Sequence, residues 1–86
     1  MKTGDKVLVR TQSAGVHFGE LISRTGQEVH LKNARRLWSW KGALSLSEVS
    51  TKGVDIPNSK ISESVEEIIL PNMIELMPLK SNLAAL

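Results

Sequence analysis

Residues 16–33 read VHFGELISRTGQEVHLKN and decide the predicted fold. Two apolar runs, 16–23 and 28–33, flank a short turn that contains glycine, which is the pattern of a β-hairpin. Val29 and Leu31 alternate with polar residues, as on a strand with one buried face. Gly19 interrupts the first run and predicts a bulge, a sharp bend or a close backbone approach.

Three further strands are expected outside this hairpin. Residues 6–11 alternate and are rich in β-branched side chains, so they join the hairpin in a three-stranded antiparallel meander. Residues 65–70 and 73–77 are apolar runs separated by Pro71, which has no N–H to donate to a sheet ladder. The pattern predicts an α+β protein, mainly β, built on a small five-stranded barrel.

The segment between the third and fourth strands, about residues 34–64, is predicted to be an insertion that contains a short helix. Ser45 and Glu48 have the spacing of a capping box at a helix start. Gly53 stands where the end of a helix favours glycine. We therefore expect a helix over about 45–52, within a single domain that spans 1–86.

The composition is that of an ordinary soluble protein, with 41% hydrophobic and 23% charged residues. The chain has no cysteine, which excludes disulfides and cysteine-ligated zinc. No apolar run approaches the roughly 20 residues of a membrane helix, so we expect a cytoplasmic protein without membrane contact. A core this small makes a homo-oligomer the expected source of extra stability.

The charge is distributed unevenly along the chain. Residues 1–42 carry eight Lys/Arg and three acidic residues, a net charge of +5. Residues 43–86 carry three lysines and six acidic residues, a net charge of −3. A modestly basic half suits a small anionic ligand or a short nucleic-acid contact better than long duplex DNA.

Residues 33–42 hold both tryptophans and the adjacent arginines. If the segment is extended, alternation places Arg36, Trp38 and Trp40 on one face and Arg35 on the other. Indole rings beside guanidinium groups suit nucleobases and phosphates, and Lys41 adds a further positive charge.

Structural roles are the alternatives for these residues. Indoles also fill a core or a subunit interface, where each removes about 150–250 Å² from water. The arginines also form solvated pairs or intersubunit salt bridges to Glu63, Glu66 or Glu67, an acidic run that we read as solvated surface.

Three residues in and beside the connection between the strands 6–11 and 16–23 complete the candidate binding site. His17 lies near glycines on both sides, where a ligand can approach the backbone and accept or donate a hydrogen bond. Ser13 and Gly15 belong to the connection before the second strand, which is either a plain hairpin turn or a loop with N–H groups free for a ligand. The other histidine, His30, falls on the polar side of its strand and is expected to be solvated.

No catalytic or metal-binding constellation accompanies these residues. Two histidines without cysteine or a nearby acidic cluster do not suggest a metal site. Serines are plentiful, but none has a partner base at a meaningful spacing. We expect a binding protein rather than an enzyme, with no cofactor and no catalytic residue.

Part of the chain resembles the Sm-like family, which includes the bacterial host-factor RNA chaperone. Residues 19–23 through 31–33 look like that family's second and third strands, and IILPNMIELMP at 68–78 looks like its fourth and fifth. The resemblance implies a ring of subunits paired through strand edges, with single-stranded RNA as the ligand. The family's N-terminal helix is missing here, and 34–64 is a large insertion.

A wider resemblance covers nearly the whole chain. SAGVHFG at 13–19, NARRLWSWKGA at 33–43 and LSLSE at 44–48 are similar to a family of small proteins of unassigned function that is common in tailed phages. Non-catalytic phage proteins of this size include sponges that sequester the nucleotide signals of host defence. By analogy, the resemblance implies an anti-defence role in the host cytoplasm.

The leading hypothesis is therefore non-enzymatic capture of a nucleotide-type ligand, a cyclic oligonucleotide or an ADP-ribose derivative. Trp38 or Trp40 would stack the base, and Arg35, Arg36 and Lys41 would hold phosphate. An Sm-like RNA-binding ring and a structural or protein-interaction module are the alternatives.

Overall fold

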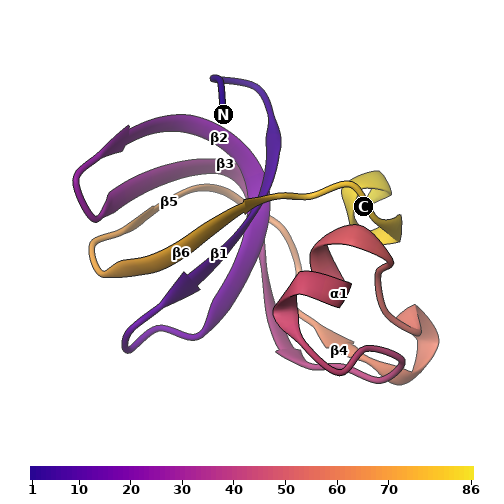
Figure 1. The fold of residues 1–86 in the computed structure, drawn as a ribbon. Helices are drawn as coiled ribbons and strands as arrows, with labels where there is room; N and C mark the ends of the chain where they lie inside the picture. Colours follow the sequence, from indigo (N-terminus) through magenta and orange to yellow (C-terminus); the bar gives the residue numbers. More distant parts are fainter.

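The computed structural model describes residues 1–86, and strands dominate it. In Figure 1 the long strands curl together on one side of the molecule, while the helix and the C-terminal turn lie on the other. The elements in chain order are β1 Lys6–Thr11, β2 Val16–Thr25, β3 Glu28–Ser39, α1 Leu46–Thr51, the 3₁₀ turn η1 Ile56–Asn58, β4 Lys60–Ile61, β5 Val65–Leu70, β6 Met73–Pro78 and the 3₁₀ turn η2 Asn82–Ala85. None of these helices has the length and apolar character that crossing a membrane requires.

The sheet is antiparallel and follows the order β4-β3-β2-β1-β6, with β5 also paired to β3. The three-stranded meander β1–β2–β3 is confirmed. β6 extends the sheet beyond β1, and β5 and β4 extend it beyond β3. The helix-bearing segment 40–59 thus leaves the sheet after β3 and returns to the same strand.

The expected five-stranded barrel does not close. Its last two strands pair with β3 and β1 instead of with each other. At the turn that joins them, backbone groups bond to other loops: the Gln12 N–H donates to the Asn72 carbonyl at 2.9 Å, and the Met73 N–H donates to the Gln27 carbonyl at 2.9 Å. Since these groups are already paired and Pro71 has no N–H, no ladder forms between β5 and β6.

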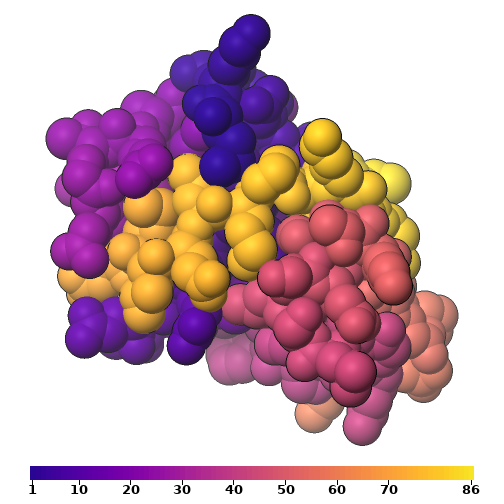
Figure 2. All heavy atoms as spheres, in the orientation of Figure 1, coloured from indigo at the N-terminus to yellow at the C-terminus, as the bar shows by residue number.

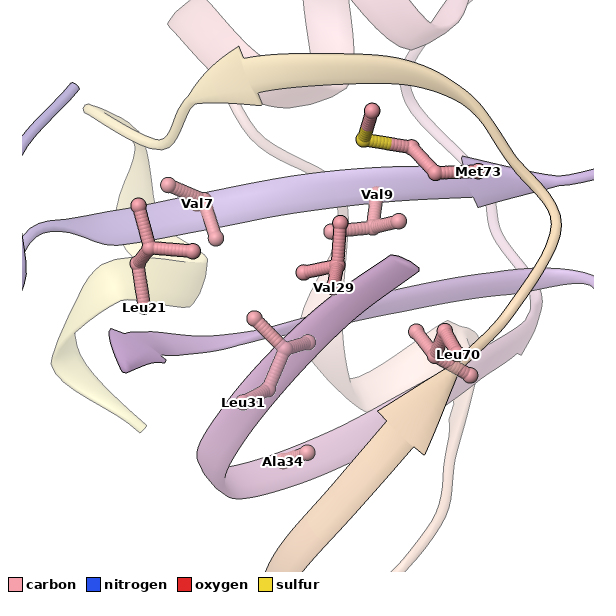
Figure 3. Packing of buried hydrophobic residues seen from close by; sticks show 8 residues of the cluster. All are labelled: Val7, Val9, Leu21, Val29, Leu31, Ala34, Leu70 and Met73. Carbon is pink, nitrogen blue, oxygen red and sulfur yellow. The ribbon is translucent and has the colours of Figure 1, made fainter. Parts of the chain in front are cut away.

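β1 is buried on both faces, and it separates two apolar clusters. Val7, Leu8 and Val9 are all fully buried. The first cluster fills the inside of the curled strands, as Figure 3 shows. It consists of Val7, Val9, Leu21, Val29, Leu31, Ala34, Leu70 and Met73. The second lies on the other face of the sheet and consists of Leu8, Phe18, Leu37, Val49, Val54, Leu79 and Leu83.

A bulge in β3 lies opposite Gly19. The β2–β3 register shifts between Phe18 and Glu20, and Asn33 on the facing strand has a positive φ of 51°, a conformation that asparagine tolerates better than most residues. A Cβ on Gly19 would lie 3.0 Å from both the Ala34 Cα and the Lys32 carbonyl oxygen. The close backbone approach expected at Gly19 is confirmed, and it lets β3 bend around the first cluster.

β3 is longer than predicted. It continues through Ser39, so residues 34–39 belong to the sheet and not to an insertion that begins at 34. The reason is the length of its pairing with β2. Thr25 of β2 lies opposite Glu28 of β3 at one end, and Val16 lies opposite Leu37 at the other. The extra strand length carries Arg35, Arg36 and Trp38.

The predicted helix is confirmed over Leu46–Thr51. The Ser45 hydroxyl accepts from the Glu48 N–H at 3.3 Å, and the Glu48 carboxylate accepts from the Leu44 N–H at 3.2 Å. Gly53 follows the helix with a φ of 91°, as a C-terminal glycine does. Val49 on the helix packs into the second cluster.

Asn82 connects the C-terminal turn to the loop after α1. Its side-chain Nδ2 donates to the Val54 carbonyl at 2.7 Å, and its Oδ1 accepts from the Val54 N–H at 3.2 Å. The space for this amide exists because Gly53 has no Cβ, which would overlap the Asn82 side chain. In Figure 2 the yellow C-terminal segment lies directly beside the pink atoms of the α1 region.

An Asn82→Asp variant should lower the free energy of unfolding by about 1–3 kcal/mol, because a carboxylate oxygen would replace the donor that faces the Val54 carbonyl. Urea unfolding at pH 7 measures the loss. Asn72→Asp is the matched control, since Asn72 is exposed in the β5–β6 turn and makes no side-chain hydrogen bond. Equal losses in the two variants would contradict a stabilising role for the Asn82 amide.

Candidate functional site

The C-terminal end of β3 presents an arginine stacked on an exposed indole. The Asn33 bulge places Arg36 and Trp38 on the same face as Ala34. The Arg36 guanidinium carbon lies 5.1 Å from the centre of the Trp38 ring, within the range of a cation–π contact. Trp38 is 63% exposed. The fold thus leaves a large aromatic surface in water beside a cation.

His17 of β2 lies beside this pair, opposite Arg36 in the ladder. Its side chain is buried, with 2% of the residue exposed. The Arg36 Nε–H donates to the His17 Nε2 at 3.2 Å, so Nε2 must offer its lone pair and the imidazole is neutral with its proton on Nδ1. Burial of the ring, and then the positive charge of Arg36, lower the pKa of His17 from 6.5 to about 4.

The other nitrogen of His17 has no partner. Nδ1 is buried and forms no hydrogen bond. Leaving a buried donor unpaired costs about 1–3 kcal/mol. His17 also lines a hollow at the surface.

The chain between β4 and β5 is tied to the arginines. The Arg36 N–H donates to the Ser62 hydroxyl at 2.7 Å, and the Ser62 N–H donates to the Arg36 carbonyl at 2.9 Å. The Arg35 Nη1 donates to the Ser62 carbonyl at 3.2 Å. Neither arginine forms an ion pair with a carboxylate: the carboxylate contacts of basic side chains join Arg10 with Glu75 and the His30 imidazole with Glu67. Neither guanidinium therefore has a carboxylate within ion-pair distance, and Glu63 is the acidic residue that lines the same hollow as His17.

Two surface hollows adjoin the Arg36–Trp38 pair. The first, called the β5 hollow, has a volume of about 260 Å³. Besides the pair, it is lined by residues that include His17, Arg35, Ser62, Glu63, Val65 and Ile68. The second, called the loop hollow, has a volume of about 480 Å³. Besides the pair, it is lined by Ser13, Ala14, Gly15, Val16 and Leu37.

Most of the residues predicted for the site come together around these hollows. Those that line one of them are Ser13, Gly15, His17, Arg35, Arg36 and Trp38. Ser13 and Gly15 reach the site because β2 starts directly after them and pairs with the end of β3. The loop turns at Gly15, whose φ is 82°.

Trp40 and Lys41 are not among the lining residues. Trp40 follows the end of β3 and packs against the second apolar cluster. The predicted common face for Trp38 and Trp40 is therefore wrong, because alternation ends with the strand at Ser39 and burial of the indole then decides its direction. Packing of this partly buried indole agrees with the structural alternative for Trp40, and a ligand contact of Trp40 stays a prediction. Lys41 is exposed, and its N–H donates to the Ser59 hydroxyl at 3.1 Å.

The sequence did not indicate the far wall of the β5 hollow. Ser62, Val65 and Ile68 reach it because β5 pairs with the first half of β3 and β4 pairs with its second half. Glu63, read as solvated surface, is exposed but also lines the hollow. His30, expected to be solvated, is partly buried and pairs with Glu67 at 2.9 Å. No local signal in the sequence marks these residues.

The site has no arrangement for metal chemistry within the chain. No group of three or more His, Cys, Asp or Glu side chains is placed to hold a metal ion. What the site offers is a flat aromatic surface and a guanidinium without an ion-pair partner. Together these suit a planar, anionic ligand.

Comparison with known proteins identifies a family. A family model described as a domain of unknown function (DUF6948) matches residues 4–85. No curated protein and no solved structure matches the chain.

Proposed function

The chain belongs to this family of domains of unknown function, and from its site we propose that it binds a nucleotide-type ligand without acting as an enzyme. The observation that carries the proposal is the exposed Trp38 ring stacked on Arg36. An indole of this kind accepts a nucleobase on its flat surface, worth about 1–3 kcal/mol per base.

The arginines supply the anion-binding part of the proposal. Arg36 uses its Nε–H on His17, which orients the guanidinium and leaves its terminal nitrogens for phosphate. Arg35 is held by the Ser62 carbonyl through Nη1, so its contribution is secondary. Because no carboxylate pairs with either guanidinium, a phosphate would meet an uncompensated charge.

His17 and the loop between β1 and β2 supply the polar contacts. The Nδ1–H of His17 is the donor that a sugar oxygen or a base acceptor would satisfy. Ser13 and Gly15 border the loop hollow on the other side of Arg36 and Trp38. In this proposal the hairpin contacts the ligand from the β2 side, and Trp38 contacts it from β3.

A phage protein with this activity would act as a sponge, holding a cyclic oligonucleotide or an ADP-ribose derivative away from a host defence receptor. Self-association, expected for so small a core, stays a prediction. An RNA-binding ring is distinguished by its salt response, because single-stranded RNA releases many counterions on binding and a compact ligand releases few.

Trp38→Ala should weaken nucleotide binding about 5- to 150-fold, which corresponds to about 1–3 kcal/mol of stacking, and should leave the fold intact because the ring is exposed. Thermal shift against cyclic dinucleotides, cyclic trinucleotides, ADP-ribose isomers and a short RNA identifies the ligand. Calorimetry then gives its affinity for each variant.

The control is Lys41→Ala, which removes an exposed cation just beyond the site. It should bind as the original protein does, while Arg36→Ala should bind more weakly. Equal affinity of the Trp38→Ala variant and the original chain, or the absence of any shift by the whole panel, would refute nucleotide binding at this site.

A further inference from the structure

We call the stacked Arg36 and Trp38 side chains, which border both hollows, the ridge. They are the residues that line both the β5 hollow and the loop hollow. The guanidinium of Arg36 and the indole of Trp38 are therefore accessible from both the β5 hollow and the loop hollow.

The position of β3 in the sheet explains this arrangement. β2 and the loop before it lie on one side of β3, and β4 and β5 lie on the other. The loop hollow is bordered by the loop before β2, whereas Val65 and Ile68 of β5 line the β5 hollow together with His17 of β2. Strands on the two sides of a central strand are about 10 Å apart, twice the spacing of neighbours, so a single base cannot fill both spaces.

The hollows also differ in what they offer. The β5 hollow, about 260 Å³, is lined by His17, Arg35 and the apolar side chains of Val65 and Ile68, among others. The loop hollow, about 480 Å³, is bordered by the small residues Ser13, Ala14 and Gly15. The first lies below the range of about 300–1,000 Å³ that is usual for a complete ligand pocket, which suits it to one ring of a larger ligand.

We propose that the ligand is a dinucleotide whose two bases occupy the two hollows while its phosphates cross the ridge at Arg36. This inference rests on the proposed nucleotide binding and selects among the ligands considered above, because ADP-ribose carries one base and a dinucleotide carries two. One base stacks against the ridge from the β5 side, next to His17, and the other from the loop side. The guanidinium in the ridge neutralises the linking phosphates.

Calorimetry with ligands of one and two bases tests the proposal. The probes are AMP, ADP-ribose, linear pApA and cyclic di-AMP, with the guanine analogues of AMP and the dinucleotides. Two bases joined in one molecule bind with the advantage of an intramolecular second contact, so at least one dinucleotide should bind about tenfold or more tightly than the matching mononucleotide and ADP-ribose.

Blocking the loop hollow alone provides the matched test. Ser13→Trp adds a large ring at an exposed position that lines this hollow. It should reduce the affinity for the dinucleotide to about that for the mononucleotide. Gln12→Trp, at the neighbouring exposed position outside the hollow, should keep the original preference.

The outcomes separate this inference from the proposed function. Equal affinities for one-base and two-base ligands in the original chain overturn the two-hollow arrangement, whatever the variants do, and leave nucleotide binding at Trp38 standing. A Ser13→Trp variant that folds and still prefers the dinucleotide also overturns it. If no nucleotide binds, both the inference and the proposed function are wrong.

Discussion

Between pH 7 and pH 4 the protein should lose roughly 3 kcal/mol of folding free energy through His17 alone. The pKa of His17 is lowered from 6.5 to about 4, first by burial and then by the charge of Arg36. Between these two values the unfolded chain binds a proton that the folded chain does not. The stability that depends on neutral His17 is therefore complete above pH 6.5 and falls as the pH falls toward 4.

Urea unfolding of the original chain and of a His17→Gln variant at a series of pH values measures this loss. Glutamine keeps an acceptor for the Arg36 Nε–H and does not titrate, so the difference between the two curves isolates the imidazole from the carboxylates that titrate in the same range. A His30→Gln variant removes the other histidine and should still show the loss due to His17. Parallel curves for His17→Gln and the original chain would mean that His17 is not held in its neutral form.

Leu31→Ala is expected to destabilise the protein by about 2–5 kcal/mol, the usual cost of removing a buried leucine side chain and leaving a cavity. Leu31 is fully buried in the first apolar cluster, between the curled strands seen in Figure 3. A loss of this size would be a large part of the free energy of unfolding of a small domain. Chemical denaturation at neutral pH gives the value.

Ile69→Ala is the matched control for this variant. It removes a side chain of the same size from β5, the strand that pairs with β3 around Leu31, but Ile69 is 56% exposed. Its loss should be about 0.5 kcal/mol, as for surface substitutions in general. Similar losses for the two variants would show that the first cluster does not hold the curled strands together.

The strands of the meander were predictable because their signals are local. Val29 and Leu31 alternate with polar residues, and both are buried. In β2 the apolar residues do not fall on one face. Phe18 packs into the second cluster and Leu21 into the first, so β2 is buried on both faces, and alternation alone cannot distinguish this from a shifted register.

The candidate site was predictable only in part. Adjacent placement of Arg36 and Trp38 follows from strand periodicity once the segment is extended. The bond between Arg36 and His17 joins residues 19 positions apart, and it depends on the pairing of β2 with β3 after the bulge at Asn33. Strand periodicity predicts the same face for Trp40, because it gives no warning that the strand ends at Ser39.

Local chemistry in the sequence was enough to establish the meander, the capped helix over Leu46–Thr51 and the aromatic and cationic character of the stretch around Trp38, since each depends on neighbouring residues. The open barrel, the burial of His17 and the two hollows on either side of Arg36 were decided by tertiary structure. They depend on which strands pair with β1 and β3, and those pairings are set by competition for burial between segments far apart in the chain.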